Sequence, residues 1–212
     1  MPRSLRDILD DAARGVFPPP DGSTTVVPQA DRRDAGVLAF TAHSVVFTDE
    51  DPRWVHETLA GLDCDPLAAT MNPRFLGALQ DRTGRRHDTT DLLTVAQALP
   101  CEPPLILKEF ADPDHPRVTR ARGRRDDVRV WAADGGVLVL GRGVAGRWET
   151  AIEVDEDVRH RGLGRLLAVA ARHLVPAGEP VWAQQSPGNA RSVRAFQAAG
   201  YRPVGAEALF IG

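Results

Sequence analysis

The sequence predicts a mixed α/β (α+β) fold, with a mostly antiparallel central sheet flanked by helices over its C-terminal half. Two observations lead to this prediction. Residues 128–154 hold three β-rich segments separated by glycine turns, as in an antiparallel meander. Residues 152–174 then change from the period of a strand to that of a helix. Prolines 103 and 104 mark a boundary, so we expect an additional α/β region at 1–104 and the main domain at 105–212.

The composition limits the class of protein. The chain has 212 residues, of which 42% are hydrophobic and 26% charged, as in ordinary globular proteins. Its net charge of −3 gives no field that would attract nucleic acid or an acidic membrane. No apolar run has the length of a membrane span, residues 1–11 lack the apolar core typical of a signal peptide, and Cys64 and Cys101 are the only cysteines. We therefore expect a cytoplasmic protein with neither membrane nor nucleic-acid partners.

The N-terminal region shows local signals for helices and strands. Ser4 and Asp7 form a capping-box pattern, which predicts a helix over residues 5–14. Residues 37–47 predict a bent strand or a hairpin. Two further helices should start at prolines 52 and 73, because proline fits the first helical position. Residues 92–96 fit either a strand or a helical turn.

This region shows no readable chemistry. Asp63, Cys64 and Asp65 are potential metal ligands, but no matching His or Cys cluster follows them, so we expect no metal. We expect residues 1–104 to pack on the main domain and to shape its functional site.

A basic run opens the main domain. Asp114 and Pro116 predict a short helix, and six arginines follow: Arg117, Arg120, Arg122, Arg124, Arg125 and Arg129. The alternatives are a solvated face balanced by Asp126 and Asp127, contact with RNA, or contact with an acidic substrate. RNA recognition adds aromatic side chains for stacking, and none interleave here, so the solvated face is favoured.

Further elements follow the basic run in order. The predicted strands and helices are the meander 128–133, 137–140 and 147–154, a helix to 174, a strand at 180–184, a helix at 190–199 and a strand at 208–211.

The turn after the meander has the features of an anion site. Ile152 and Val154 suit a strand, while Gly162 and Gly164 let the backbone turn sharply and approach a ligand closely. The helix that follows exposes unpaired N–H groups and the positive end of its dipole. Three arginines surround the turn: Arg159, Arg161 and Arg165.

This turn has three alternative interpretations. A dinucleotide fingerprint fails, because Leu167 stands where its third glycine is required and Glu179 precedes a strand. A Walker loop fails, because the sequence has no Gly-Lys-Ser/Thr. The third interpretation, an ordinary glycine turn with solvated arginines, is not excluded by the sequence.

The motif Arg159-x-x-Gly162-x-Gly164 after a strand resembles the acetyl-CoA signature of the GNAT superfamily of N-acetyltransferases. A second motif begins at Asn189 and ends at Gly200-Tyr201, and it resembles the second half of the GNAT fold. The resemblance covers about residues 105–212. It implies a GNAT-type fold whose two central strands splay apart near the acceptor pocket.

The resemblance also implies a cofactor site for acetyl-CoA as co-substrate, with no metal. The Val154 N–H would polarise the thioester carbonyl, and Asn189 would contact the pantetheine arm or serve only as a helix N-cap. The implied cofactor-binding residues are Ile152, Val154, Arg159, His160, Arg161, Gly162, Leu163, Gly164, Arg165, Asn189, Ser192 and Phe196.

The catalytic base and acid are less well defined. Many GNAT enzymes use a carboxylate on the strand before the cradle, which is the anion-binding turn of residues 159–165. The candidates here are Glu153 and Glu149, with ion pairs to arginine as the alternative role. The tyrosine that usually protonates the thiolate is replaced by Phe196. Tyr201, the only tyrosine, is expected to pack in the core.

The resemblance therefore implies an acetyl-CoA-dependent N-acetyltransferase. It would transfer an acetyl group to the primary amine of an unidentified acceptor, a small molecule rather than a protein, by direct attack on the thioester. The alternative is an acyl-CoA-binding regulatory or interaction protein with little or no catalysis. A homodimer is left open.

Overall fold

The computed structural model describes residues 3–109 and 115–212, and these residues form two compact units. Unit 1 runs to Leu92 and includes 204–212, while unit 2 is 93–203. The compact units thus divide within a strand, whereas the sequence suggests a boundary at the prolines before residue 105. The end of the chain belongs to unit 1 because its last strand pairs with a strand of that unit, where Phe210 lies opposite Ala35.

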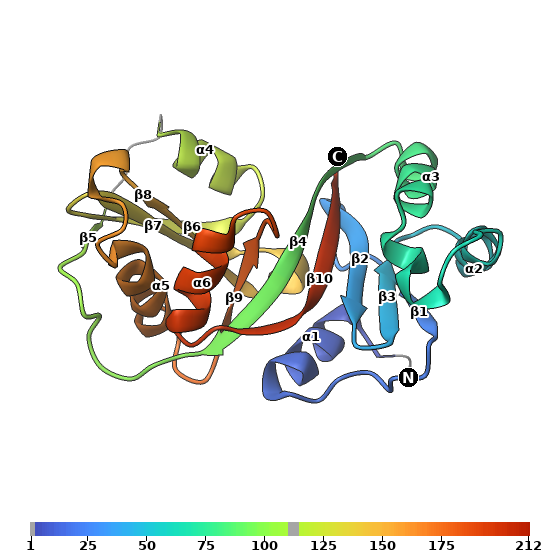
Figure 1. The fold of residues 1–212 in the computed structure, drawn as a ribbon, viewed down its shortest axis with the longest axis horizontal. Helices are drawn as coiled ribbons and strands as arrows, with labels where there is room; N and C mark the ends of the chain where they lie inside the picture. The colour runs from blue at the N-terminus through green and yellow to red at the C-terminus, as the bar shows by residue number, and fades with distance from the viewer. Residues whose placement is uncertain (1–2, 110–114) are drawn as a thin grey trace. The chain divides into compact units, whose positions relative to one another are not determined.

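Unit 1 contains a sheet with the strand order β1-β3-β2-β10-β4 (Figure 1). The strands β2 and β3 form an antiparallel hairpin, one of the two forms predicted for this segment. The strand β1 runs parallel to β3, and β10 runs antiparallel to β2. The undecided segment 92–96 lies in β4 and is a strand. The bounds are β1 Thr24–Val27, β2 Asp34–Phe40, β3 His43–Phe47, β4 Arg86–Gln97 and β10 Arg202–Ile211.

The helices of unit 1 begin where the capping signals predict. They are α1 Leu5–Arg14, α2 Pro52–Ala60 and α3 Pro73–Thr83, with the 3-10 helix η1 Pro66–Met71 between the last two. At the start of α1 the Ser4 hydroxyl accepts from the Asp7 N–H at 3.1 Å, and the Asp7 carboxylate accepts from the Ser4 N–H at 3.0 Å. The apolar faces of α2 and α3 pack on the sheet through Val55, Phe75, Leu76 and Leu79.

Unit 2 contains strands in the order β4-β9-β8-β7-β6-β5. The predicted meander is confirmed as β6, β7 and β8, and β8 runs parallel to β9. The bounds are β5 Lys108–Glu109, β6 Asp126–Ala133, β7 Gly136–Arg142, β8 Trp148–Val154 and β9 Pro180–Gln185. The fold is therefore the predicted mixed α/β class with mostly antiparallel pairing.

Three helices flank this sheet, namely α4 Pro116–Arg122, α5 Leu163–Leu174 and α6 Ala190–Ala198. The predicted helix signal at Asp114 lies outside the described residues, and His115 caps α4. The helices α5 and α6 lie side by side (Figure 1). Two 3-10 turns, η2 Val144–Gly146 and η3 Glu156–Val158, stand on either side of β8.

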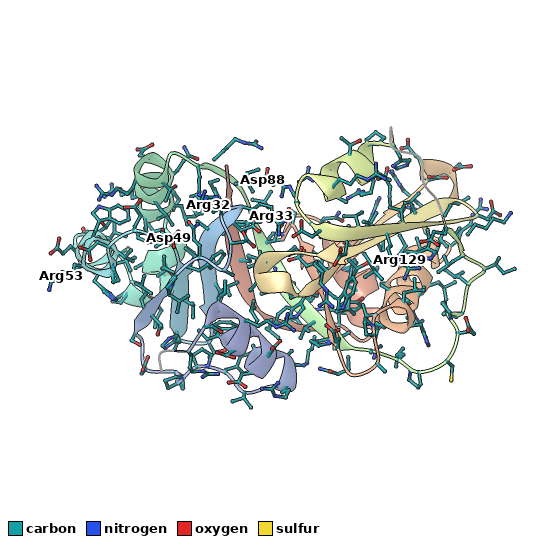
Figure 2. The ribbon with its side chains drawn as sticks, turned by 180° about the vertical axis from the view of Figure 1, so that it is seen from behind. Arg32, Arg33, Asp49, Arg53, Asp88 and Arg129 are labelled. Carbon is teal, nitrogen blue, oxygen red and sulfur yellow. The ribbon has the colours of Figure 1, made fainter. Side chains whose placement is uncertain are left out.

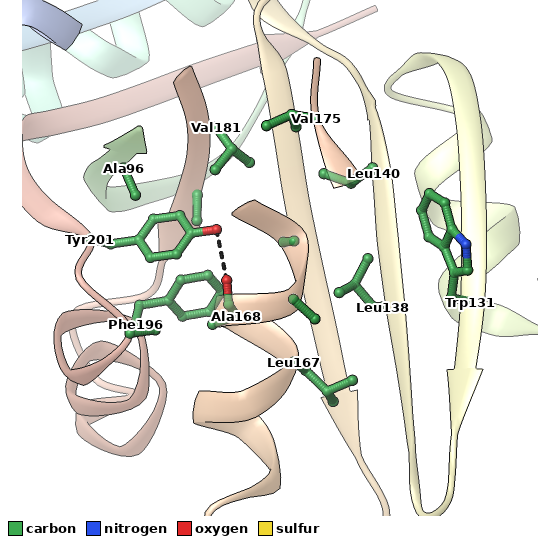
Figure 3. Packing of buried hydrophobic residues seen from close by; sticks show 14 residues of the cluster. Ala96, Trp131, Leu138, Leu140, Leu167, Ala168, Val175, Val181, Phe196 and Tyr201 are labelled. Carbon is green, nitrogen blue, oxygen red and sulfur yellow. Dashed lines mark hydrogen bonds between the residues drawn. The ribbon is translucent and has the colours of Figure 1, made fainter. Parts of the chain in front are cut away.

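Strand β7 shows how the two faces of this sheet are covered. Leu138 and Leu140 point to the core that contains α5 and α6 (Figure 3), and Val137 and Val139 point to the core that contains α4. Side chains alternate between faces along a strand, so a strand covered on both sides must be apolar throughout. This is why the middle of the unit 2 sheet reads as a continuous apolar run.

The described residues also bear on membrane and metal binding. No helix within residues 3–109 and 115–212 is both long and apolar enough to cross a bilayer. Over the same ranges, no group of three or more His, Cys, Asp or Glu side chains is placed to hold a metal ion. Cys64 and Cys101 are free thiols.

Candidate cofactor and active site

The strands β8 and β9 pair only where they begin. Their parallel register joins Trp148 to Val181 and Glu149 to Trp182, whereas β7 pairs with β8 along its whole length. The edge of β8 that faces β9 is therefore left without a strand partner from Thr150 onward. Backbone N–H and C=O groups at such an edge are available to a ligand. The splaying implied by the resemblance is confirmed.

Helix α5 begins at the end of this open edge without a capping side chain. Gly162 is its N-cap with φ 86°, a left-handed conformation that glycine adopts without strain. The N–H of Leu166 reaches the Gly162 carbonyl at 3.2 Å, so the earlier N–H groups of Leu163, Gly164 and Arg165 have no acceptor inside the helix. No acidic residue stands in the first turn. The helix start can therefore bind an anion.

The arginines around this turn fall into two groups. Arg161 and Arg165 are exposed, and neither forms an ion pair with any residue in the described ranges. Arg159 instead donates from Nε to the Val154 carbonyl at 3.2 Å and lies 3.7 Å from Glu156. Two uncompensated guanidinium groups thus add positive charge to the dipole of α5.

Gly164 is the point where the two motifs meet. A methyl group at this position would lie 3.8 Å from the Ile152 side chain, 3.6 Å from Val154 and 3.9 Å from Ala195 of α6. Ile152, Val154 and Ala195 are all half-buried. The fold therefore lines the space beside α5 with apolar side chains from both β8 and α6, although the two motifs lie far apart in the sequence.

The residues of the second motif take different places. Asn189 is exposed and caps α6, since its side chain accepts from the Ser192 N–H at 3.1 Å. The N-cap role predicted for it is confirmed. Phe196 is 3% exposed and lies in the core, where its ring meets Tyr201 at 4.9 Å, edge to face (Figure 3). A cofactor has no access to a side chain in that position.

The only tyrosine is a structural residue. The Tyr201 hydroxyl donates to the Ala168 carbonyl at 3.1 Å, and burial raises the pKa of this phenol although the Arg172 charge opposes the shift (Figure 3). The expected packing role of Tyr201 is confirmed. Because the usual acid position is Phe196, no tyrosine hydroxyl is left to protonate a leaving thiolate.

Glu149 lies in a buried ion-pair network. Its carboxylate accepts from Arg147 Nε at 2.8 Å, from Arg125 Nε at 2.9 Å and from the Val144 N–H at 3.3 Å. Burial acts to raise the pKa of Glu149, but the charges of the two arginines outweigh it and lower that pKa to about 2. A carboxylate held in this way is a poor proton acceptor, and this favours the ion-pair role that the sequence left open.

Glu153, four residues further along the same strand, has a different environment. Its side chain is 45% exposed and meets Arg117 Nε of α4 at 2.8 Å. Both predicted base candidates thus have arginine partners, but only Glu153 is open to solvent. An exposed ion pair of this kind is weak and can be displaced by an incoming ligand.

The basic run is partly neutralised. Arg117, Arg125 and Arg129 all pair with glutamates, the last with Glu109 at 3.3 Å. Arg129, labelled in Figure 2, also lies over the Trp131 ring at 4.7 Å. Arg117 and Arg129 form exposed ion pairs, which agrees with the solvated face favoured by the sequence. Arg125 does not, because its side chain is 12% exposed and belongs to the buried network around Glu149. The partners of these three arginines are glutamates and not the predicted Asp126 and Asp127.

Together, the meander, the diverging β8–β9 pair and the open start of α5 define a GNAT-type fold, as the sequence predicts. A family model confirms this assignment for one stretch of the chain. Residues 150–210, from β8 through β10, match the model described as FR47-like protein. A search of curated proteins returned no match.

The solved structures that resemble the chain include the following three. A GCN5-related N-acetyltransferase from Kribbella flavida is 18% identical with a TM-score of 0.42, over 64% of this chain and 63% of that one. A tandem GNAT protein from the clavulanic acid biosynthesis pathway, without AcCoA, is 16% identical with a TM-score of 0.42, over 65% and 57%. A GCN5-related N-acetyltransferase from Sphaerobacter thermophilus is 13% identical with a TM-score of 0.39, over 64% and 55%. The chain spans less than two thirds of the length of each of them.

Proposed function

We propose that unit 2 binds acetyl-CoA and transfers its acetyl group to a primary amine. The GNAT-type fold supports acyl transfer in general. The observation that carries the finer proposal is the uncapped start of α5, with Arg161 and Arg165 unpaired within the described residues, at the end of an open strand edge. A pyrophosphate needs N–H donors and positive charge, and an extended pantetheine arm needs a free strand edge.

Each part of the cofactor has proposed partners. The N–H groups from His160 to Arg165 and the guanidinium groups of Arg159, Arg161 and Arg165 would hold the pyrophosphate. The backbone of Ile152 and Val154 would bind the pantetheine arm on one side, with Asn189 and Ser192 on the other. The Val154 N–H would polarise the thioester carbonyl. We leave Phe196 out of this set because it lies in the core.

For the base we propose Glu153 and leave out Glu149, because only the Glu153 carboxylate is accessible. It would take a proton from the amine, directly or through water, so that the neutral amine attacks the thioester. Water would protonate the leaving thiolate. The acceptor would be a small molecule, and the cytoplasm, predicted from the composition, is the proposed location.

A second function is favoured by one observation. The Tyr201 hydroxyl is bound to a core carbonyl and Phe196 is buried, so the usual acid is missing. An acyl-CoA-binding regulatory protein with little catalysis would need the cradle and not the acid. The two functions differ in whether any amine is acetylated after acetyl-CoA has bound.

Thermal unfolding in separate samples with acetyl-CoA, coenzyme A, NAD and ATP tests the cradle. A ligand at a hundred times its dissociation constant stabilises the protein by about 2.7 kcal/mol, a rise in Tm of a few degrees. We expect this rise with acetyl-CoA and coenzyme A, and its loss in the double variant Arg161→Glu, Arg165→Glu. Arg53→Glu, an exposed arginine on α2 (Figure 2), is the matched control and should keep the rise.

An amine screen then separates the two functions, with thiol release from acetyl-CoA as the signal. Acetylation of any amine supports the transferase, while tight binding without acetylation supports the regulatory protein. If neither acetyl-CoA nor coenzyme A raises the Tm, or if NAD or ATP raises it more than they do, both proposed functions are overturned.

A further inference from the structure

Unit 1 contains a hydrogen-bonded chain of three side chains that the acyl-transfer proposal does not use. Asp21 precedes β1, Thr25 lies in β1, and His43 begins β3. His43 Nδ1 lies 3.0 Å from Asp21 Oδ1, and His43 Nε2 lies 2.9 Å from Thr25 Oγ1. Ser23 Oγ stands 3.3 Å from Nδ1, on the same side of the ring as Asp21. An imidazole therefore bridges a carboxylate and a hydroxyl through its two nitrogens.

The partners fix which nitrogen carries the proton. An ionised carboxylate can only accept a hydrogen bond, so the neutral His43 ring donates from Nδ1. Hydrogen bonds from the Ser23 side chain and backbone, and then from His43, lower the pKa of Asp21 to about 2, which keeps this carboxylate ionised. Nε2 is then left with a lone pair, and the Thr25 hydroxyl donates to it. This is the arrangement of a nucleophile, a general base and an orienting acid.

Burial and exposure fit these roles. The His43 side chain is 5% exposed, so its orientation is held by packing as well as by Asp21. Thr25 is exposed on β1, which is the terminal strand of the unit 1 sheet. A reagent can therefore reach the hydroxyl, while the base behind it is shielded from bulk water.

We propose that Thr25 is an activated nucleophile that accepts an acyl group from activated esters of short carboxylic acids. Thr25 Oγ1 attacks the ester carbonyl and forms a new ester bond, while its proton passes to His43 Nε2. The bond from the acyl carbon to the leaving alcohol then breaks, and the proton on His43 passes to that leaving oxygen. Asp21 acts as a positioning residue that holds the ring in the required tautomer.

The same hydrogen bonds could instead only tie the segment 21–25 to β3. A purely structural role predicts that Thr25 is no more reactive than any other threonine hydroxyl. Thr58 gives the comparison, because its hydroxyl donates to the Trp54 carbonyl at 2.7 Å.

The test is incubation of the whole chain with p-nitrophenyl acetate, followed by intact mass and peptide mapping. We expect acetylation of Thr25 in the wild type and in Thr58→Val. Thr25→Ser should be acetylated on the new serine hydroxyl, whereas Thr25→Val should carry no acetyl group at position 25. Loss of the general base in His43→Gln should slow the labelling about a hundredfold. Circular dichroism checks that each variant is folded.

Asp21→Asn has a separate readout. We expect a downfield proton resonance from His43 Nδ1–H in the wild type, lost in this variant together with the fast labelling. No acetyl group on Thr25 in the folded wild type would overturn the proposal, and this result needs no variant. Labelling at an unchanged rate in folded His43→Gln would overturn it as well.

Discussion

The two ends of strand β8 differ in strand pairing and in exposure to solvent. At its start the strand is paired on both sides, and Glu149 is buried among two arginines. At its end one edge is open, Glu153 is exposed, and the chain continues toward an uncapped helix. The same strand thus changes from a closed structural element to an accessible one within a few residues.

This comparison shows what decides the role of a carboxylate. Glu149 and Glu153 share one face of β8, and each has arginine partners. A buried ion pair that loses one member leaves an unpaired charge without water, whereas an exposed pair is replaced by solvent at little cost. Accessibility, and not the presence of an arginine, therefore separates the structural glutamate from the candidate base.

The largest expected effect comes from Glu149→Gln, which removes the charge that two arginines share. Loss of one partner of a buried pair should lower the free energy of unfolding by about 3–5 kcal/mol. Urea denaturation measures this. Glu156→Gln, whose side chain is 90% exposed, is the control and should change stability little. Equal stability of the two variants would remove the distinction between the ends of the strand.

The acid dependence of stability sharpens the same point. The pKa of Glu149 is lowered from 4.5 to about 2 in the folded protein, so its ionised form stabilises the fold. This contribution should be fully present above about pH 4.5 and should be lost as the pH falls toward 2. The difference in stability between wild type and Glu149→Gln should therefore shrink over that range. A difference that is constant with pH would show that Glu149 acts through packing and not through charge.

A smaller effect is expected from Gly143→Ala, beside the network. A methyl group at Gly143 would overlap the Glu149 carboxyl group, so the carboxylate would have to move away from its arginines. Overpacking of this kind typically costs about 1–3 kcal/mol. Gly77→Ala in α3 meets no atom within 4 Å and serves as the matched control. Thermal unfolding of both variants decides whether the space around Glu149 is as closed as the network requires.

The smallest effect on stability is expected from Glu153→Gln at the open end. Its exposed pair with Arg117 should contribute about 0–1 kcal/mol. If Glu153 is the base, however, acetyl transfer should fall by at least about a hundredfold. Arg117→Gln breaks the same ion pair but keeps the carboxylate, so it should retain activity. Equal activity of wild type and Glu153→Gln would exclude Glu153 as the base.

The elements that the sequence predicts carry local signals. The capping box at Ser4 and the prolines at the starts of α2 and α3 act within one helical turn, so neighbouring residues suffice to recognise them. The short strand β1 and the 3-10 helix η1 were not predicted. Four residues with a strand preference give too weak a pattern, and β1 exists because β3 pairs with it.

The candidate site likewise has features that the sequence alone indicates and contacts that only the folded structure reveals. The glycines and arginines at the start of α5 are contiguous in the sequence, so the sequence alone indicates an anion site there. The network around Glu149 depends on Arg125, which lies 24 positions earlier. The hydrogen bond between the Asp21 and His43 side chains likewise joins two segments that only the sheet brings together. No local pattern could reveal these contacts.

The sequence by itself determined the fold class, the meander and the open helix start of this protein, because each follows from short-range backbone preferences and charge. Only the tertiary structure decided that Phe196 belongs to the core, that Glu149 is a buried structural anion, and that Thr25 has a histidine behind it. Burial and the distance between side chains depend on long-range packing, and the same residue types serve structure or chemistry according to that packing.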